Sequence, residues 1–142
     1  MLAEKIRKSA FKHIESELFS YHETRKEIIR LRNEILYSSG PTDDENVGGS
    51  RPSLPGDPTG SKATRLATHK KLTHLESIVQ SIETIYNGLD ENKKRLVNLY
   101  YWTRPQTLTW EGIAQKLHIS RRQAINWRDD IIKDMSDLLG WR

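Results

Sequence analysis

Cysteine and long hydrophobic runs are both missing from this chain. Its 142 residues include no cysteine, only five prolines, and apolar side chains at 35% of the total. Without thiols the chain forms neither a disulfide framework nor a thiolate metal site. A bilayer-spanning helix needs roughly 18 or more consecutive apolar residues, and no such run exists. We therefore expect an intracellular soluble protein without a membrane segment, built as one compact domain or two small helical ones.

The residue patterns of common catalytic and cofactor sites are also missing. The five histidines form neither an i, i+4 metal pair nor a set with a third carboxylate ligand, and there is no glycine-rich phosphate loop. Tyr100 and Tyr101 could be nucleophiles for DNA cleavage, but no cluster of Arg and His surrounds them in sequence. We expect no enzyme, no catalytic residue, no metal and no cofactor.

Two stretches carry apolar residues at alternating spacings of three and four, which is typical of helices with a packing seam. The first stretch contains Phe11, Ile14, Leu18, Tyr21, Ile28 and Ile35. The second contains Leu72, Leu75, Val79, Ile82 and Tyr86, widened by Ile78 and Ile85. Each predicts one long helix, and the two could bury their stripes as an antiparallel hairpin or pair between chains. Arg25 and Arg32 interrupt the first seam, so we expect them to reach its edge or to meet Glu partners.

A segment rich in Pro, Gly, Ser and Asp separates the two predicted helices. It runs from about residue 38 to residue 62 and offers almost nothing to bury. This composition predicts a flexible loop. The stretch LPGDPTG at residues 54–60 has enough turn-forming residues to favour local order in some context.

The segment LTWEGIAQKLHISRRQAINW at residues 108–127 has the apolar spacing of a helix-turn-helix. Thr109 and Ser120 can each cap a helix, and Ala114 is small enough for the two helices to cross closely. His118 stands in the turn where many such motifs have Gly, and His is among the residues that adopt a positive φ. The apolar faces of the two predicted helices comprise Trp110, Ile113, Ala114 and Leu117, and Ala124, Trp127, Ile131, Met135 and Leu138.

A third helix precedes this pair in the prediction. Asp90 can cap a helix that carries Leu96, Val97, Leu99 and Tyr100. The side chains of Trp102, Trp110 and Trp127 are expected to fill the small core between the three helices. The sequence thus predicts an all-α protein: a long helical hairpin at residues 1–88, followed by a three-helix DNA-binding domain at residues 89–142.

The second helix of the pair exposes side chains suited to reading DNA. In this motif the N-terminal residues of that helix reach base edges in the major groove, where Arg forks onto guanine and Asn onto adenine. The helix is basic at its start and acidic after Arg128, from Asp129 to Asp137, so its start would face phosphates. The predicted DNA-binding residues are Thr109, Ser120, Arg121, Arg122, Gln123, Asn126 and Arg128.

Four stretches together resemble the RinA family of phage transcriptional activators: residues 16–28, 54–60, 101–128 and 138–142. The resemblance implies a protein that switches on phage late genes by binding promoter DNA in the cytoplasm of a bacterial host. The C-terminal part is also similar to region four of bacterial sigma factors, which reads promoter DNA. By that similarity Ser120, Arg121, Arg122 and Asn126 fall on positions that approach DNA. Sigma factors commonly have Glu where this chain has Arg122, so their base preference does not carry over.

The expected partners follow from this interpretation. They are double-stranded DNA and, through the hairpin or the acidic end of the last helix, host RNA polymerase or a second copy in a homodimer. The main alternative is a small-terminase-like DNA-packaging adaptor, which also joins a helix-turn-helix to a helical hairpin but works as a ring of many subunits. A helical scaffold without a nucleic-acid role is the third hypothesis, and salt-insensitive failure to bind any duplex would favour it.

Overall fold

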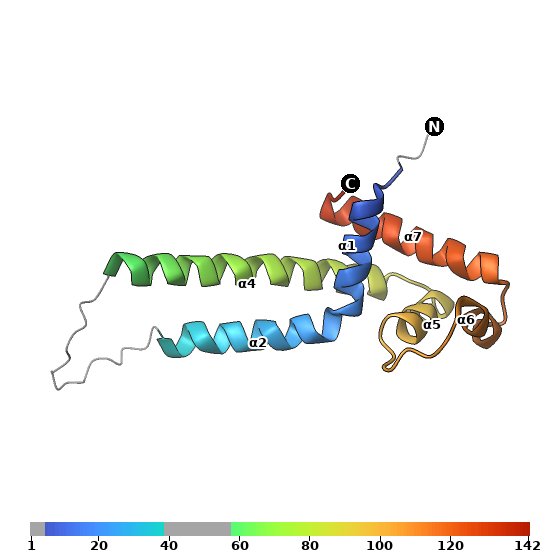
Figure 1. Ribbon diagram of the computed structural model, residues 1–142, viewed down its shortest axis with the longest axis horizontal. Helices are drawn as coiled ribbons and strands as arrows, with labels where there is room; N and C mark the ends of the chain where they lie inside the picture. The colour runs from blue at the N-terminus through green and yellow to red at the C-terminus, as the bar shows by residue number, and fades with distance from the viewer. Residues whose placement is uncertain (1–4, 39–57) are drawn as a thin grey trace. The chain divides into compact units, whose positions relative to one another are not determined.

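The computed structural model describes residues 5–38 and 58–142, with side chains for residues 5–37 and 62–142. This part of the chain is all helical, without a strand, as predicted (Figure 1). Within these ranges no helix is both long enough and apolar enough to cross a membrane. The helices are α1 (Lys8–Phe19), α2 (Tyr21–Ser38), α4 (Pro58–Asn87), α5 (Glu91–Tyr100), α6 (Trp110–Leu117) and α7 (Arg121–Leu139).

The chain divides into two compact units. One joins residues 1–23 to residues 78–142, and the other spans residues 24–77. We call the first the head unit and the second the hairpin unit. The head unit therefore includes α1 and the end of α4 together with α5, α6 and α7. The division into a helical hairpin at residues 1–88 and a DNA-binding domain at residues 89–142 stays a prediction.

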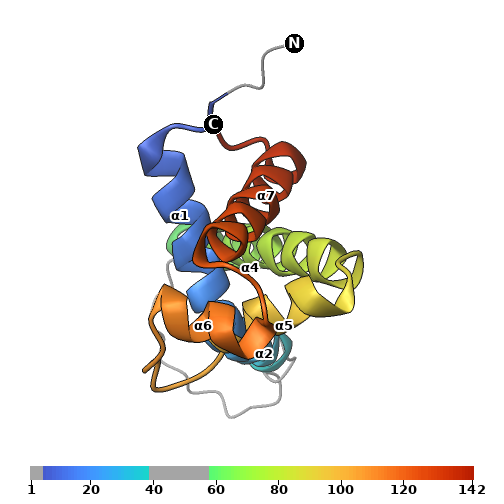
Figure 2. The same ribbon diagram turned by 90° about the vertical axis from the view of Figure 1, so that its right-hand side faces the viewer.

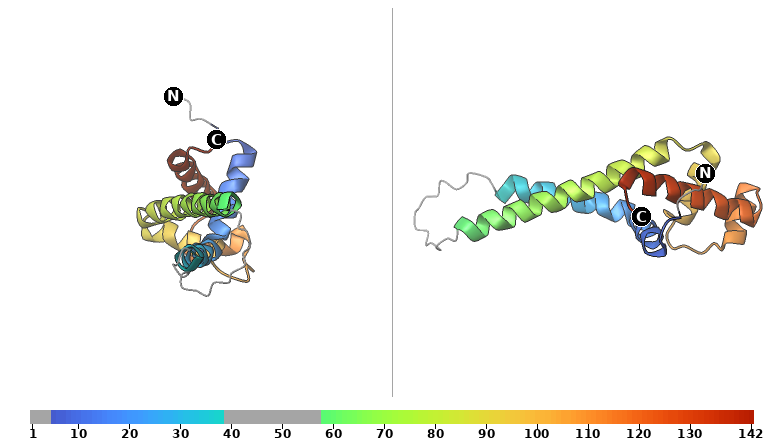
Figure 3. Two further views of the ribbon diagram at one scale, coloured as in Figure 1. Left: turned by 90° about the vertical axis from the view of Figure 1, so that its left-hand side faces the viewer. Right: turned by 90° about the horizontal axis from the view of Figure 1, so that it is seen from above.

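In the hairpin unit, α2 and α4 run side by side in opposite directions (Figures 1 and 3). Ile28 and Leu31 of α2 are buried, and Arg32 forms an ion pair with Glu76 of α4 at 2.7 Å. The predicted helical hairpin and a Glu partner for Arg32 are thus confirmed. Pro58, a residue favoured at the first helical position, opens α4, and residues 39–57 of the predicted loop lie outside the described residues.

The first apolar ladder forms two helices, so the prediction of a single long helix is wrong. The chain leaves helical geometry at Ser20, between α1 and α2. Carbonyl groups at the end of a helix need new donors, and here side chains from a distant segment supply them. The indole Nε1 of Trp102 donates to the carbonyl of Leu18 at 2.9 Å, and Arg104 donates to the carbonyl of Phe19.

Helix α1 packs against α7 in the head unit (Figures 1 and 2). Its residues Ile14 and Leu18 are almost completely buried. On α7 this contact widens the buried stripe to include Ile132 and Ser136, whereas Leu138 remains 48% exposed. The prediction that Leu138 faces inward is therefore wrong, because the last turns of α7 bury Met135 and Ser136 instead.

Tyrosines rather than tryptophans are the buried aromatic residues in the described part of the head unit, where Tyr21 and Tyr101 are both buried. Tyr101 is completely buried, while Trp102, Trp110 and Trp127 are only partly buried. Trp110 stacks on Tyr100 with ring centroids 4.3 Å apart. The expectation that the three indoles fill the core is therefore only partly correct, since they lie at its edge.

Candidate nucleic-acid interface

Helices α6 and α7, which form the predicted helix-turn-helix, each begin at a side-chain cap. The Thr109 hydroxyl accepts a hydrogen bond from the Gly112 amide at 3.1 Å, and the Ser120 hydroxyl accepts one from the Gln123 amide at 3.0 Å. Asp90 caps α5 in the same way, accepting from the Lys93 amide at 2.9 Å. A cap satisfies an amide that has no partner within its helix. All three caps predicted from the sequence are therefore confirmed.

The turn between α6 and α7 depends on a left-handed residue. His118 has φ 60° and ψ 42°, and its amide donates to the carbonyl of Gln115 at 3.2 Å. The Ile119 amide donates to the carbonyl of Ala114 at 3.0 Å. These bonds close the end of α6 and direct the chain straight into α7. The small residue Ala114 is buried beneath this turn, as its predicted position at the helix crossing requires.

Four of the predicted site residues lie in the first two turns of α7. Arg121, Arg122, Gln123 and Asn126 are all exposed there. Arg122 and Asn126 are one turn apart, so they share a face of the helix. Arg121 lies within 3.6 Å of Glu111 on α6, a contact between two mostly exposed side chains. Such a pair is weak in water and leaves Arg121 free to exchange partners.

The N-terminal ends of α6 and α7 also contribute to this surface. The first turns of α6 and α7 present backbone amides and the positive end of a helix dipole. Thr109 and Ser120 are exposed at these ends, each using its hydroxyl as a cap. A phosphate oxygen at either end would accept from amides and hydroxyls alike, so the geometry suits a polyanion along the α6 and α7 termini.

Comparison with known proteins places this chain in a family. The model of a family described as "Protein of unknown function (DUF722)" matches residues 12–137. The chain belongs to the DUF722 family. It is also 26% identical over 137 residues to a protein named transcriptional activator rinA from Staphylococcus phage phi11, covering 93% of this chain and 91% of that protein. No solved structure matches.

The similarity to rinA confirms the resemblance found in the sequence and suggests transcriptional regulation for this DUF722 protein. The name of that relative describes a transcriptional activator, which is not an enzymatic role. The match spans both the head unit and the hairpin unit, since it covers 93% of the chain. The similarity is therefore not limited to the predicted helix-turn-helix.

Arg128, the remaining predicted site residue, has a different environment in the DUF722 chain. Two residues turn an α-helix by about 200°, so Arg128 and Asn126 lie on nearly opposite sides of α7. The side chain of Arg128 is only 19% exposed, and its guanidinium lies 3.7 Å from Glu15 and 2.8 Å from Asp129. The structure does not bring Arg128 onto the exposed face that Arg122 and Asn126 share.

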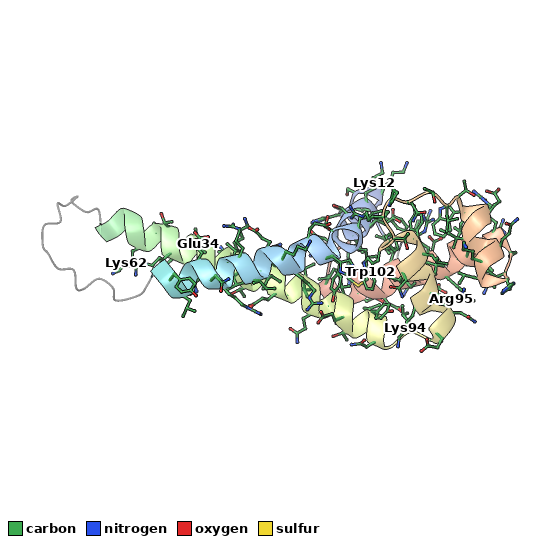
Figure 4. The ribbon with its side chains drawn as sticks, turned by 90° about the horizontal axis from the view of Figure 1, so that it is seen from below. Lys12, Glu34, Lys62, Lys94, Arg95 and Trp102 are labelled. Carbon is green, nitrogen blue, oxygen red and sulfur yellow. The ribbon has the colours of Figure 1, made fainter. Side chains whose placement is uncertain are left out.

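Sequence reasoning missed two exposed cations beside the helix-turn-helix. Arg95 of α5, labelled in Figure 4, donates to the carbonyl of Lys116 at the end of α6 at 3.3 Å. Lys116 is itself exposed. The signal in the sequence is the basic run at residues 93–95. In the structure Lys94 of this run lies 5.6 Å from the centre of the Tyr86 ring. A basic run just before a predicted helix-turn-helix can extend its DNA-binding surface.

Proposed function

We propose that this protein is a sequence-specific DNA-binding transcriptional activator of phage late genes. The observation that carries the proposal is the start of α7, where exposed Arg121, Arg122 and Asn126 follow a capped, left-handed turn. In a helix-turn-helix these positions enter the major groove. The similarity to transcriptional activator rinA supports a role in transcription.

Base recognition follows from the chemistry of these side chains. An Arg guanidinium can donate two parallel hydrogen bonds to guanine, and an Asn amide can pair with adenine. Each good bidentate contact contributes about 1 to 3 kcal/mol of discrimination. Gln123 extends the same surface. Thr109 and Ser120 lie at the helix ends, where their hydroxyls and the backbone amides can donate hydrogen bonds to phosphates. In this proposal α7 reads the base sequence, and the N-terminal ends of α6 and α7 position the protein on the duplex.

Activation needs a second contact besides DNA. We propose that host RNA polymerase is that partner and that the protein acts in the bacterial cytoplasm as a monomer or homodimer. The exposed carboxylates of Asp134 and Asp137 on the far end of α7 support this, because they are unsuited to phosphates. Binding to purified bacterial RNA polymerase, measured with the wild-type chain and an Asp134→Asn, Asp137→Asn variant, tests this contact. No binding by the wild-type chain would remove it from the proposal.

Selection from a random duplex library tests the DNA-binding proposal. We expect the full chain to enrich one sequence family at near-physiological salt. The Arg121→Ala, Arg122→Ala variant should lose that preference because the forked donors to base edges are gone. Its melting temperature should hardly change, since both side chains are exposed. The readout is the sequence distribution of bound duplexes.

A matched control separates base reading from general charge. Arg30→Ala removes an exposed Arg from α2 that pairs with Glu27 at 2.7 Å and Glu34 at 3.2 Å. This variant should select the same sequences as the wild-type chain. If the Arg121→Ala, Arg122→Ala variant also selects them, the residues assigned to base recognition are the wrong ones.

A further inference from the structure

Arg128 lies at the centre of a cluster that joins four segments of the head unit. The guanidinium carbon of Arg128 lies 5.0 Å from the centre of the Phe11 ring and 5.3 Å from that of the Trp110 ring. Its terminal nitrogen lies 3.7 Å from a carboxylate oxygen of Glu15. The same Glu15 oxygen accepts a hydrogen bond of 2.7 Å from the hydroxyl of Tyr101. The cluster therefore links α1, the end of α5, the start of α6 and the middle of α7.

The charge of Arg128 is neutralised inside the protein. Both Arg128 and Glu15 are less than one-fifth exposed, at 19% and 18%, and Asp129 holds the other edge of the guanidinium. A cation beside aromatic rings and a mostly buried carboxylate interacts with them more strongly than it would in water. If the Arg128 side chain turned outward to bind a phosphate, the carboxylate of Glu15 would be left poorly solvated and without its ion-pair partner. This environment favours an internal role for Arg128.

The position of the cluster decides what it can control. Trp110 is the first residue of α6 and directly follows the cap Thr109. Arg128 lies two turns into α7, about 10 Å along the helix from Arg121. Helices α6 and α7 also pack on each other through buried apolar residues, which include Ile113 and Ala124. A contact between Trp110 and Arg128 therefore constrains the angle at which the two helices meet.

We propose that Arg128 is a positioning residue, which together with Glu15 of α1 fixes α7 against the start of α6. This inference rests on the proposed function, because it assigns Arg128 to the alignment of Arg121, Arg122 and Asn126 and not to a phosphate contact. It also makes α1, more than 80 residues away in sequence, part of the DNA-reading unit. The expected consequence is a loss of base discrimination without a loss of charge at the interface.

Salt dependence distinguishes the two roles. Loss of a phosphate contact lowers binding to all sequences and reduces the slope of log affinity against log salt by about 1. Loss of alignment instead lowers binding to the preferred sequence alone. We therefore expect Arg128→Met, in the full chain, to reduce the ratio of affinities for a selected duplex and a scrambled duplex by about tenfold. Its salt slope and its affinity for the scrambled duplex should equal those of the wild-type chain.

Glu15→Gln provides the second variant, because it keeps the size of the side chain and an oxygen that can accept from Tyr101. It should reproduce the effect of Arg128→Met, and the double variant should lose no more than either single one, as expected of residues that act together. Arg30→Met is the control, since Arg30 also pairs with two carboxylates. Binding is measured well below the melting temperature of each variant, so that all are folded.

Three results would overturn the inference. A salt slope lowered by about 1 in Arg128→Met would show a direct phosphate contact. An unchanged affinity ratio in Arg128→Met, or in Glu15→Gln should the first variant not fold, would show that the cluster has only a structural role. Failure of the wild-type chain to bind any duplex would remove the proposed function and this inference with it, whereas the first two results leave the proposed function intact.

Discussion

His118 determines how α6 connects to α7, and its backbone conformation has a cost. A residue with a Cβ atom is disfavoured in the left-handed region by about 1 kcal/mol, and His118 has φ 60°. We expect His118→Gly to raise the free energy of unfolding by about 0.5 to 1 kcal/mol. Urea unfolding followed by circular dichroism measures this.

The matched control for His118→Gly is the reverse change at the end of α7. Gly140 has φ 77°, and a Cβ there would meet no atom within 4 Å. Gly140→Ala should therefore lower stability through backbone strain alone, by about 1 kcal/mol. A destabilised His118→Gly variant would show that the His118 side chain contributes more than its backbone strain costs.

Tyr101 links the stability of the head unit to pH. Burial of its phenol raises the pKa of Tyr101 well above the usual 10.0, and the nearby Glu15 carboxylate raises it further. A raised pKa means that the folded state favours the neutral phenol. The contribution of Tyr101 is therefore complete below about pH 10 and falls as the pH rises further.

The variant Tyr101→Phe tests this pH dependence. It loses the hydrogen bond to Glu15, so at pH 7 it should be less stable than the wild-type chain by about 1 kcal/mol. The difference should shrink above pH 10, because the phenol of the unfolded wild-type chain then ionises while the buried phenol stays neutral, which favours unfolding. Urea unfolding at pH 7, 9 and 11 measures it, and a difference that is constant over this range would contradict the assignment.

At the scale of elements, local chemistry was enough to predict the caps and the turn. Asp90, Thr109 and Ser120 act on amides only three residues away, so their effect can be inferred from the sequence alone. The break at Ser20 could not be found in this way. It depends on donors from Trp102 and Arg104, more than 80 residues further along the chain.

The same limit explains the errors on α7. The periodicity identified Ala124, Ile131 and Met135 as buried, and they are. It could not identify Ile132 or Ser136, because α1 covers that side of α7 and belonged to the hairpin in the sequence interpretation. The contact of Arg128 with Glu15 of α1 could not be inferred for this reason too, whereas the exposed start of the helix needed no knowledge of its neighbours.

We expect the packing of α1 in the head unit to contribute to the free energy of unfolding. Ile14 is completely buried, so Ile14→Ala should lower the free energy of unfolding by about 2 to 5 kcal/mol. Ile29 of α2 is 54% exposed, and Ile29→Ala should change it by no more than about 0.5 kcal/mol. Thermal unfolding compares the two. Equal, small effects would show that α1 contributes little to the head unit.

At the scale of the molecule, the net charge of +4 is modest for the proposed DNA-binding role. The arrangement of charge matters more, since α7 begins with Arg121 and Arg122 and continues with Asp129 and Asp130. Only its start suits phosphates. DNA should therefore approach the head unit from the α6 and α7 N-terminal ends, and its affinity should fall with salt.

Oligomeric state separates the activator from the small-terminase-like alternative. We expect light scattering of the DNA-free chain to give the mass of one or two copies. A packaging adaptor would instead form a closed ring of many subunits. A mass many times that of one chain would favour the ring and would contradict the expected monomer or dimer.

The location of bound DNA on the chain is the most direct test. Amide NMR spectra of the isotope-labelled full chain, recorded before and after addition of a selected duplex, would map it. The account predicts that the largest shifts fall on residues 109–112 and 118–126, with smaller ones along α5 near Arg95. Shifts confined to residues 24–77 would contradict it, because DNA would then bind the hairpin unit and not the start of α7.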